Sequence, residues 1–98
     1  MADLKGEPVQ IGERTFIVPR VTVDAYFHMK EEAAAHDGDM VPLLVSQILT
    51  LLQRNYPDLT RGNLLVDTGL ELADLNDVHQ AVTAAAYGIG GKRPNSFV

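Results

Sequence analysis

The chain has 98 residues, of which 46% are apolar and 21% charged, and its formal net charge is −5. This composition predicts one small folded domain, and the acidic balance argues against a nucleic-acid backbone as the main partner. The lack of cysteine excludes disulfides and thiolate metal sites and fits a cytoplasmic protein, and neither a run of roughly 18 apolar residues nor a signal-peptide pattern is present.

The first predicted element is a β-hairpin. Two runs of β-forming residues, 9–11 and 14–18, flank Gly12-Glu13, and the glycine supplies the positive φ of a tight turn. Pro19 ends the pairing, because it cannot donate to a ladder. The hairpin is either a lid on the core or a partner-binding edge. The alternating apolar side chains on one side of each strand are Val9, Ile11, Phe16 and Val18.

A helix is predicted next, from a cap at Thr22 or Asp24 to about Ala35. Its apolar residues cluster on one face, and Lys30 falls within that arc with a stem that can lie along it. The loop 36–39 breaks the helix and ends on a residue that can cap the next one. The clustered residues are Tyr26, Phe27, Met29, Ala33 and Ala34.

The most apolar stretch, residues 40–55, predicts the central helix and spine of the core. Its apolar side chains cover roughly half the helix circumference, so several elements should pack on it. Pro42 fits the first turn, and the helix should stop near Asn55-Tyr56-Pro57, because the residue before a proline disfavours helical geometry. Leu43 lies off the apolar face, among polar side chains. The residues within the arc are Met40, Val41, Leu44, Val45, Ile48, Leu49, Leu51 and Leu52.

Two further helices complete the predicted fold. Thr60 can cap a short helix over about residues 61–67, which Gly69 would end. Asp74 can cap a last helix, which Gly88 and the glycines after it would end. Its apolar stripe consists of Leu75, Val78, Val82, Ala85 and Ala86, with His79 at the margin as a partly buried histidine.

Together these elements predict a mainly α fold, a small helical domain of about four helices with an N-terminal β-hairpin packed on it. We expect residues 1–8 to form a flexible N-terminus, residues 9–88 the single domain and residues 89–98 a flexible C-terminal tail. The core of so short a chain is small, so its stability should be modest and a partner or oligomer contact can add to it.

Little in the sequence points to catalysis, a metal or a cofactor. His28 and Glu32 are four residues apart on one helical face near the loop 36–39, but two ligands are not a site and the loop is too short for an EF-hand. Ser46 has no histidine or aspartate placed by sequence to activate it. The stretch 67–70, Asp-Thr-Gly-Leu, lacks the serine of an acyl-carrier protein. We therefore expect a non-enzymatic interaction domain without a cofactor, with a carrier protein as a less favoured alternative.

Three pieces of the chain carry a family resemblance. Residues 11–19 read Ile-Gly-Glu-Arg-Thr-Phe-Ile-Val-Pro, residues 52–60 read Leu-Gln-Arg-Asn-Tyr-Pro-Asp-Leu-Thr, and residues 72–88 form an Ala-rich stretch that ends in glycine. In this order and spacing they resemble the tail assembly chaperones of long-tailed bacteriophages, whose opening hairpin often reads Ile-Gly-Gly-x-x-Tyr/Phe-x-Val-Pro. The chain departs from the pattern at Glu13, which stands for the second glycine, and at residues 61–63, where an acidic run is usual.

The resemblance implies a phage or prophage protein of the host cytoplasm that is not expected in the mature virion. Such chaperones bind the tape-measure protein, keep its apolar helices soluble and help recruit the major tail protein. The resemblance also implies a frameshift-extended form of the chain as a partner, with Gly91-Lys92 as the candidate frameshift position, and a possible homo-oligomer. Neither nucleic acid nor membrane is an expected partner. The alternative is another small phage structural or connector protein, such as a head–tail joining protein.

Four residues are our candidates for a partner interface. They are Phe16 and Ile17 on the hairpin, Leu43 on the central helix and Tyr87 at the end of the last helix. Leu43 is a candidate because it is an apolar side chain on a polar face, although a single exposed leucine is common and needs no functional explanation. We expect the partner to bind as a helix in a groove.

Overall fold

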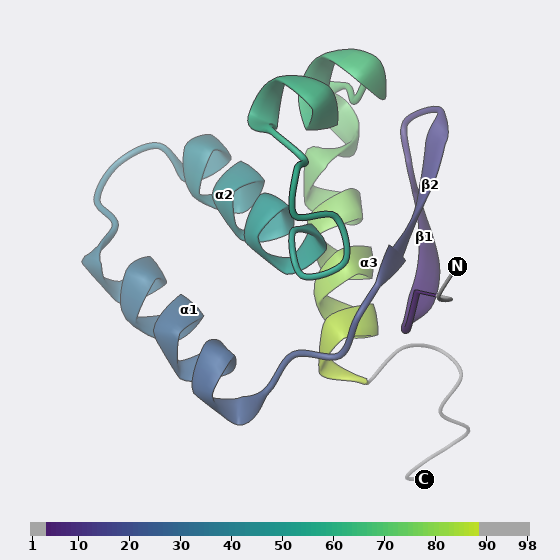
Figure 1. Ribbon diagram of the computed structural model, residues 1–98. Helices are drawn as coiled ribbons and strands as arrows, with labels where there is room; N and C mark the ends of the chain where they lie inside the picture. The colour runs from purple at the N-terminus through teal and green to yellow at the C-terminus, as the bar shows by residue number, and fades with distance from the viewer. Residues whose placement is uncertain (1–3, 89–98) are drawn as a thin grey trace, which may run out of the picture.

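The computed structural model describes residues 4–88, which form a mainly helical domain with an N-terminal β-hairpin (Figure 1). The predicted fold class is therefore confirmed. The elements in chain order are β1 (Glu7–Ile11), β2 (Arg14–Val18), α1 (Val23–Ala35), α2 (Met40–Leu52), the π-helical turn η1 (Asn63–Asp67), the 3₁₀ turn η2 (Leu72–Asp74) and α3 (Leu75–Tyr87).

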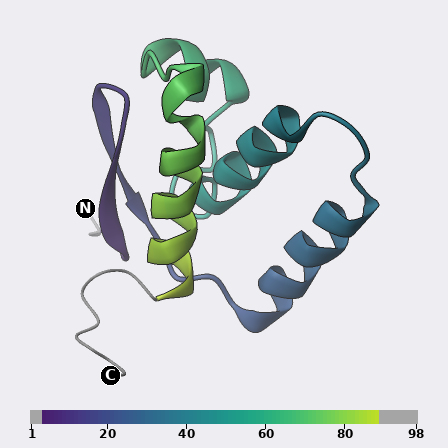
Figure 2. The ribbon, with the colours of Figure 1, turned by 180° about the vertical axis from the view of Figure 1, so that it is seen from behind.

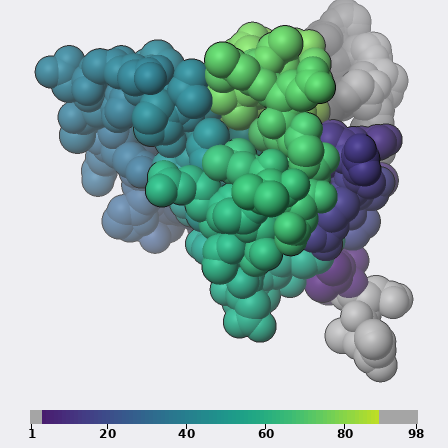
Figure 3. All heavy atoms as spheres, turned by 90° about the horizontal axis from the view of Figure 1, so that it is seen from above, coloured from purple at the N-terminus to yellow at the C-terminus, as the bar shows by residue number. Residues whose placement is uncertain are grey.

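Helices α2 and α3 pack against each other at the centre of the domain, and α3 runs between α2 and the hairpin (Figure 2). The hairpin lies along α3, mainly through β1. Seen from above, the green segment around η1 fills the space between the teal start of α2 and the purple hairpin (Figure 3). Helix α1 lies to one side of this centre (Figure 1). The core is therefore built from α2, α3, the hairpin and the η1 segment, with α1 at its margin.

The hairpin forms as its alternating pattern predicts. The strands are antiparallel, and the last pair, Ile11 with Arg14, leaves Gly12-Glu13 as a two-residue turn in which Gly12 has a φ of 60°. Burial alternates along both strands. The apolar side chains that enter the core are Val9, Ile11, Phe16 and Val18.

The first strand begins at Glu7, two residues before the predicted start of the domain. The segment 1–8 is therefore not wholly a flexible terminus, which corrects that boundary. Asn55 holds this part of the chain, because its Nδ2 atom donates to the carbonyl oxygens of Lys5 (2.9 Å) and Ile17 (2.8 Å). A side-chain amide thus satisfies backbone carbonyls on both sides of the strand pair.

The tip of the hairpin docks on the end of η1. The backbone N–H of Glu13 donates to the carbonyl oxygen of Thr68 at 2.9 Å. Thr68 is 1% exposed, and its hydroxyl donates to the carbonyl oxygen of Leu64 and accepts from the N–H of Leu70. The buried hydroxyl is thus fully hydrogen-bonded, and it fixes the backbone on which the hairpin tip rests.

Phe16, a candidate interface residue, is wholly buried, so its side chain belongs to the core of the domain. Its ring packs edge-to-face on Tyr56 with the ring centroids 5.2 Å apart. The hydroxyl oxygen of Tyr56 accepts a hydrogen bond of 2.8 Å from the N–H of Ile17. Tyr56 therefore joins the end of α2 to β2 by a ring contact and a hydrogen bond, while Ile17 is partly buried.

Helix α2 begins as predicted, because the carboxylate of Asp39 accepts a hydrogen bond of 3.0 Å from the N–H of Val41. It ends at Leu52, slightly before the predicted stop at Asn55-Tyr56-Pro57. The first residues of its predicted apolar arc are not covered, since Met40 is 54% and Val41 37% exposed.

The buried side of α2 extends over residues that the sequence assigned to its polar face. Leu43 is 5% exposed and Gln47, one turn later on the same side, is 9% exposed. The amide oxygen of Gln47 lies 2.7 Å from Nε2 of His79, so α3 covers this side and supplies the hydrogen bond that a buried amide needs. The expectation that Leu43 is exposed on a polar face is therefore wrong, while its role in partner binding stays a prediction.

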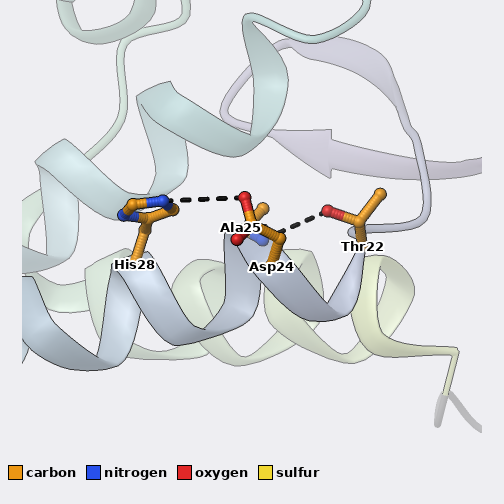
Figure 4. A network of polar contacts seen from close by, with 4 residues as sticks. All are labelled: Thr22, Asp24, Ala25 and His28. Atoms are coloured by element: carbon orange, nitrogen blue, oxygen red, sulfur yellow. Dashed lines mark hydrogen bonds and ion pairs between the residues drawn. The ribbon is translucent and has the colours of Figure 1, made fainter.

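Helix α1 has its predicted cap, because the hydroxyl of Thr22 accepts a hydrogen bond of 3.1 Å from the N–H of Ala25 (Figure 4). Its predicted apolar face does not cover the core. Of the thirteen residues of α1, all of them described, Met29 is the buried one, whereas Phe27 is 58% exposed. Residues two apart lie about 200° apart around a helix, so Phe27 and Met29 cannot both face α2.

The segment between α2 and α3 follows the predicted signals in part. The hydroxyl of Thr60 accepts a hydrogen bond of 3.1 Å from the N–H of Asn63, as a cap should, but the short helix continues as a single π-helical turn. Gly69 ends it with a φ of 70°. Asp74 makes no side-chain capping bond, because the chain enters α3 through the 3₁₀ turn η2, and this capping prediction is wrong. Gly88 ends α3 as predicted, with a φ of 78°.

The predicted tail, 89–98, lies outside the described residues, and so does the candidate frameshift position Gly91-Lys92. Both stay predictions. Within residues 4–88, no helix is both long enough and apolar enough to cross a membrane.

Candidate partner-binding surface

The polar side chains that the sequence singles out form pairwise contacts. Nε2 of His28 lies 3.6 Å from the carboxylate of Asp24, with both side chains exposed (Figure 4). Glu32 accepts a hydrogen bond of 3.1 Å from the hydroxyl of Ser46, which links α1 to α2. Among the described residues, no group of three or more His, Cys, Asp or Glu side chains could hold a metal ion.

His79 is partly buried at the contact between α3 and α2, as its position at the margin of the apolar stripe predicts. Burial lowers its pKa below the usual 6.5, because the charged imidazolium loses solvation. The amide oxygen of Gln47 can only accept, so the Nε2 atom of His79 carries the hydrogen that joins them.

We expect His79 to make the domain less stable as the pH falls. Because its pKa is lower in the folded than in the unfolded chain, the unfolded chain binds more protons as the pH falls below about 7, and protonation favours unfolding. Thermal unfolding between about pH 7 and pH 5 should show a shallower fall of Tm in His79→Gln than in the wild type. The matched variant His28→Gln, at an exposed site, should keep the wild-type slope. An unchanged slope in His79→Gln contradicts the prediction.

A surface that we call the α1 patch joins the start of α1 to the end of α3. Val23 is 72% and Phe27 58% exposed, which is high for large apolar side chains. Together with Val21, Thr22 and two tyrosines they line a surface hollow of about 350 Å³. The α1 patch consists of Val21, Val23, Tyr26, Phe27 and Tyr87.

The aromatic rings of the α1 patch pack against one another. Tyr26 lies at the centre, with its ring centroid 5.6 Å from that of Phe27 and 5.4 Å from that of Tyr87, both edge-to-face. Burial, and then the neighbouring Tyr26, raise the pKa of Tyr87 above its usual 10, so its hydroxyl is neutral at physiological pH. The backbone is fixed nearby, where the N–H of Val21 donates to the carbonyl oxygen of Ala86 at 2.8 Å. The patch is therefore a preformed apolar surface.

The four sequence candidates do not form one surface. Tyr87 lines the α1 patch, whereas Phe16 and Leu43 are buried and Ile17 is half-buried on the hairpin. Sequence reasoning missed Phe27 as an exposed residue, because it assigned the apolar side of α1 to the core. The one available signal was that this apolar side is too wide for every member to meet α2.

A second exposed apolar surface, the η1 patch, lies at the start of α2 and around η1 and η2. It consists of Met40, Val41, Val66 and Leu72, which are 54%, 37%, 78% and 73% exposed. Val41 and Leu72 also line a hollow of about 190 Å³ with Leu65, Leu70 and other side chains. This patch could not be predicted from the sequence, because Met40 and Val41 belong to the predicted buried arc of the central helix.

Comparison of the chain with protein-family models, with curated proteins and with solved structures found no match. The features of the chain that bear on its function are therefore the sequence resemblance and the exposed apolar surfaces. Both patches are lined mainly by apolar side chains, so the interaction they support is the burial of a partner's apolar side chains.

Proposed function

We propose that this chain is a tail assembly chaperone of a long-tailed bacteriophage or prophage. In this role it binds the tape-measure protein non-enzymatically and helps to recruit the major tail protein. The observation that carries the proposal is the α1 patch, a preformed apolar surface that the domain leaves open. A chaperone for apolar helices needs such a surface, and the sequence resemblance supplies the class of protein.

The size of the α1 patch suits a reversible contact. Full burial of a Val or Phe side chain stabilises by about 1.5–3 kcal/mol, and Val23 and Phe27 are only partly open to begin with. Association itself costs at least about 4 kcal/mol in lost rigid-body freedom. One copy should therefore bind one helix weakly, while several copies along a long partner hold it well by multivalency. A protein that assists assembly and then departs needs this combination.

The test is co-expression of the chain with the tape-measure protein of the same phage. We expect the wild type to co-purify with its partner and to raise the fraction of partner in the supernatant. The double variant Val23→Ser/Phe27→Ser should lower the co-purified amount about tenfold or more, because it removes the apolar surface on which the partner packs. Its Tm should change little, since both side chains are exposed.

The matched control is Val66→Ser/Leu72→Ser, which removes two comparably exposed apolar side chains from the η1 patch. It should co-purify with the tape-measure protein as the wild type does. Equal loss in both double variants would show that general surface apolarity, and not the α1 patch, drives binding. If the wild type neither co-purifies with the tape-measure protein nor changes its solubility, the proposed function is wrong.

A further inference from the structure

A groove between α1 and α2 adjoins the α1 patch, and Val21 and Thr22 line both. It encloses about 280 Å³, and buried Met29 and Leu51 contribute to its lining together with Ala25 and Thr50. Small-molecule pockets usually measure roughly 300–1,000 Å³, so this groove is small for a metabolite but has room for individual apolar side chains. A helix lying along the groove could insert one edge into it.

The groove is bordered by carboxylates on its α1 side. Asp24 and Glu32 line it, and Asp24 and His28 project from α1 toward α2 (Figure 4). The stretch 24–39 contains five carboxylates and one lysine, so it carries four of the five net negative charges of the chain. Two of these five carboxylates, those of Asp24 and Glu32, line the groove itself.

The opposite border carries less charge. Arg54 lines the groove from the end of α2, and Thr50 lies one turn before it. A ligand in the groove therefore meets two carboxylates and one guanidinium among the lining side chains, with Glu31 and the acidic loop 36–39 near by in sequence.

We propose that the α1–α2 groove binds a basic amphipathic helix, whose apolar edge packs on Met29 and Leu51 and whose lysine or arginine side chains face the carboxylates of α1. This inference rests on the proposed function and specifies the kind of partner segment that the chain recognises. Apolar burial supplies the attraction. The complementary charge selects among apolar helices, since an acidic helix meets like charges along α1.

The probes are two synthetic helical peptides of about 18 residues, a length at which a helix is sustained in water. Both carry the same leucine and alanine stripe; one has lysine and the other glutamate on the polar face. At about 50 mM salt the lysine peptide should bind at least about tenfold more tightly than the glutamate peptide, and the ratio should shrink at about 500 mM salt. NMR chemical-shift changes should be largest in α1 and at residues 50–54.

Charge reversal tests the groove directly. In Asp24→Lys/Glu32→Lys we expect the lysine peptide to bind about tenfold more weakly and the preference between the two peptides to fall or reverse. Glu13→Lys/Asp58→Lys makes the same change in net charge at two exposed sites that do not line the groove, and it should largely retain the preference. Both pairs are exposed, so folding should be intact in each.

Several results would overturn the inference. Equal binding of the two peptides, equal effects of the two double variants, or no binding of either peptide would each do so. If neither peptide binds and charge reversal at the groove instead changes the oligomeric state, the occupant is a second copy of the chain. The proposed function stands through all of these results if the wild type still co-purifies with the tape-measure protein, and it fails separately if that co-purification is absent.

Discussion

Replacement of Phe16 by alanine is expected to lower the free energy of unfolding by about 3–5 kcal/mol, the usual range for removing a buried phenylalanine. The ring is wholly buried and packs edge-to-face on Tyr56. The guanidinium of Arg14 lies over the ring, at 4.8 Å from its centroid. A domain of this size has roughly 5–15 kcal/mol of total stability, so the variant should lose a large fraction of it. Urea denaturation, compared with the wild type, measures the loss.

Ile17→Ala is the matched control for Phe16→Ala. Its side chain is half-buried, and the bond from its N–H to the hydroxyl of Tyr56 is retained, so the loss should be about 1 kcal/mol or less. If Phe16→Ala folds with wild-type stability but loses the partner, Phe16 is an interface residue after all and the core assignment is wrong.

Replacement of Gly12 by alanine should cost about 2–4 kcal/mol, a large effect for one added methyl group. Gly12 has a φ of 60°, which is unfavourable for alanine by roughly 1–2 kcal/mol. A Cβ at this position would lie 2.0 Å from the carbonyl oxygen of Thr68, so the hairpin tip must move off η1. That movement also breaks the hydrogen bond from the N–H of Glu13 to Thr68, worth about 1 kcal/mol.

Gly69→Ala separates backbone strain from the docking contact. Gly69 has a φ of 70°, close to that of Gly12, but a Cβ there would meet no atom within 4 Å. Its loss of stability should therefore be only the roughly 1–2 kcal/mol of the left-handed conformation. Equal losses in Gly12→Ala and Gly69→Ala, measured by urea denaturation, would show that the hairpin tip does not depend on Thr68.

Local signals predicted the elements of the fold well, because the groups that form them are close in sequence. Gly12 predicted the hairpin turn, and the hydroxyls of Thr22 and Thr60 cap the helices that they were expected to cap. Asp74 failed as a cap because the 3₁₀ turn before α3 replaces a capping bond. That choice depends on the path of the chain from Gly69, which no local pattern specifies.

The faces of the helices were predicted less well, because they depend on neighbours that are distant in sequence. Leu43 is buried because α3 packs on the side of α2 that also carries Gln47. His79 on α3 supplies the hydrogen bond that the buried amide of Gln47 needs. Phe27 is exposed since Met29, on the other side of α1, is the residue that faces the core. A helical wheel shows how apolar residues are distributed around a helix but not which part of the arc is covered.

The candidate surfaces could be predicted only in fragments. Tyr87 was named, but its neighbours in the α1 patch, Tyr26 and Phe27, were assigned to the core. The groove exists because α1 and α2 pack at a particular distance from each other, and the sequence of either helix alone does not specify that distance. Asp24 and Glu32 are visible in the sequence, but only the packing of α1 against α2 shows that both line one groove.

The marginal attachment of α1 has a consequence for how such a protein can evolve. This helix gives one buried side chain, that of Met29, to the core, so most of its surface is under little selection for folding. Mutations there can accumulate and be tested for recognition while the rest of the domain stays intact. The residues that maintain the fold are thus different from the residues of α1 that can change as the partner changes.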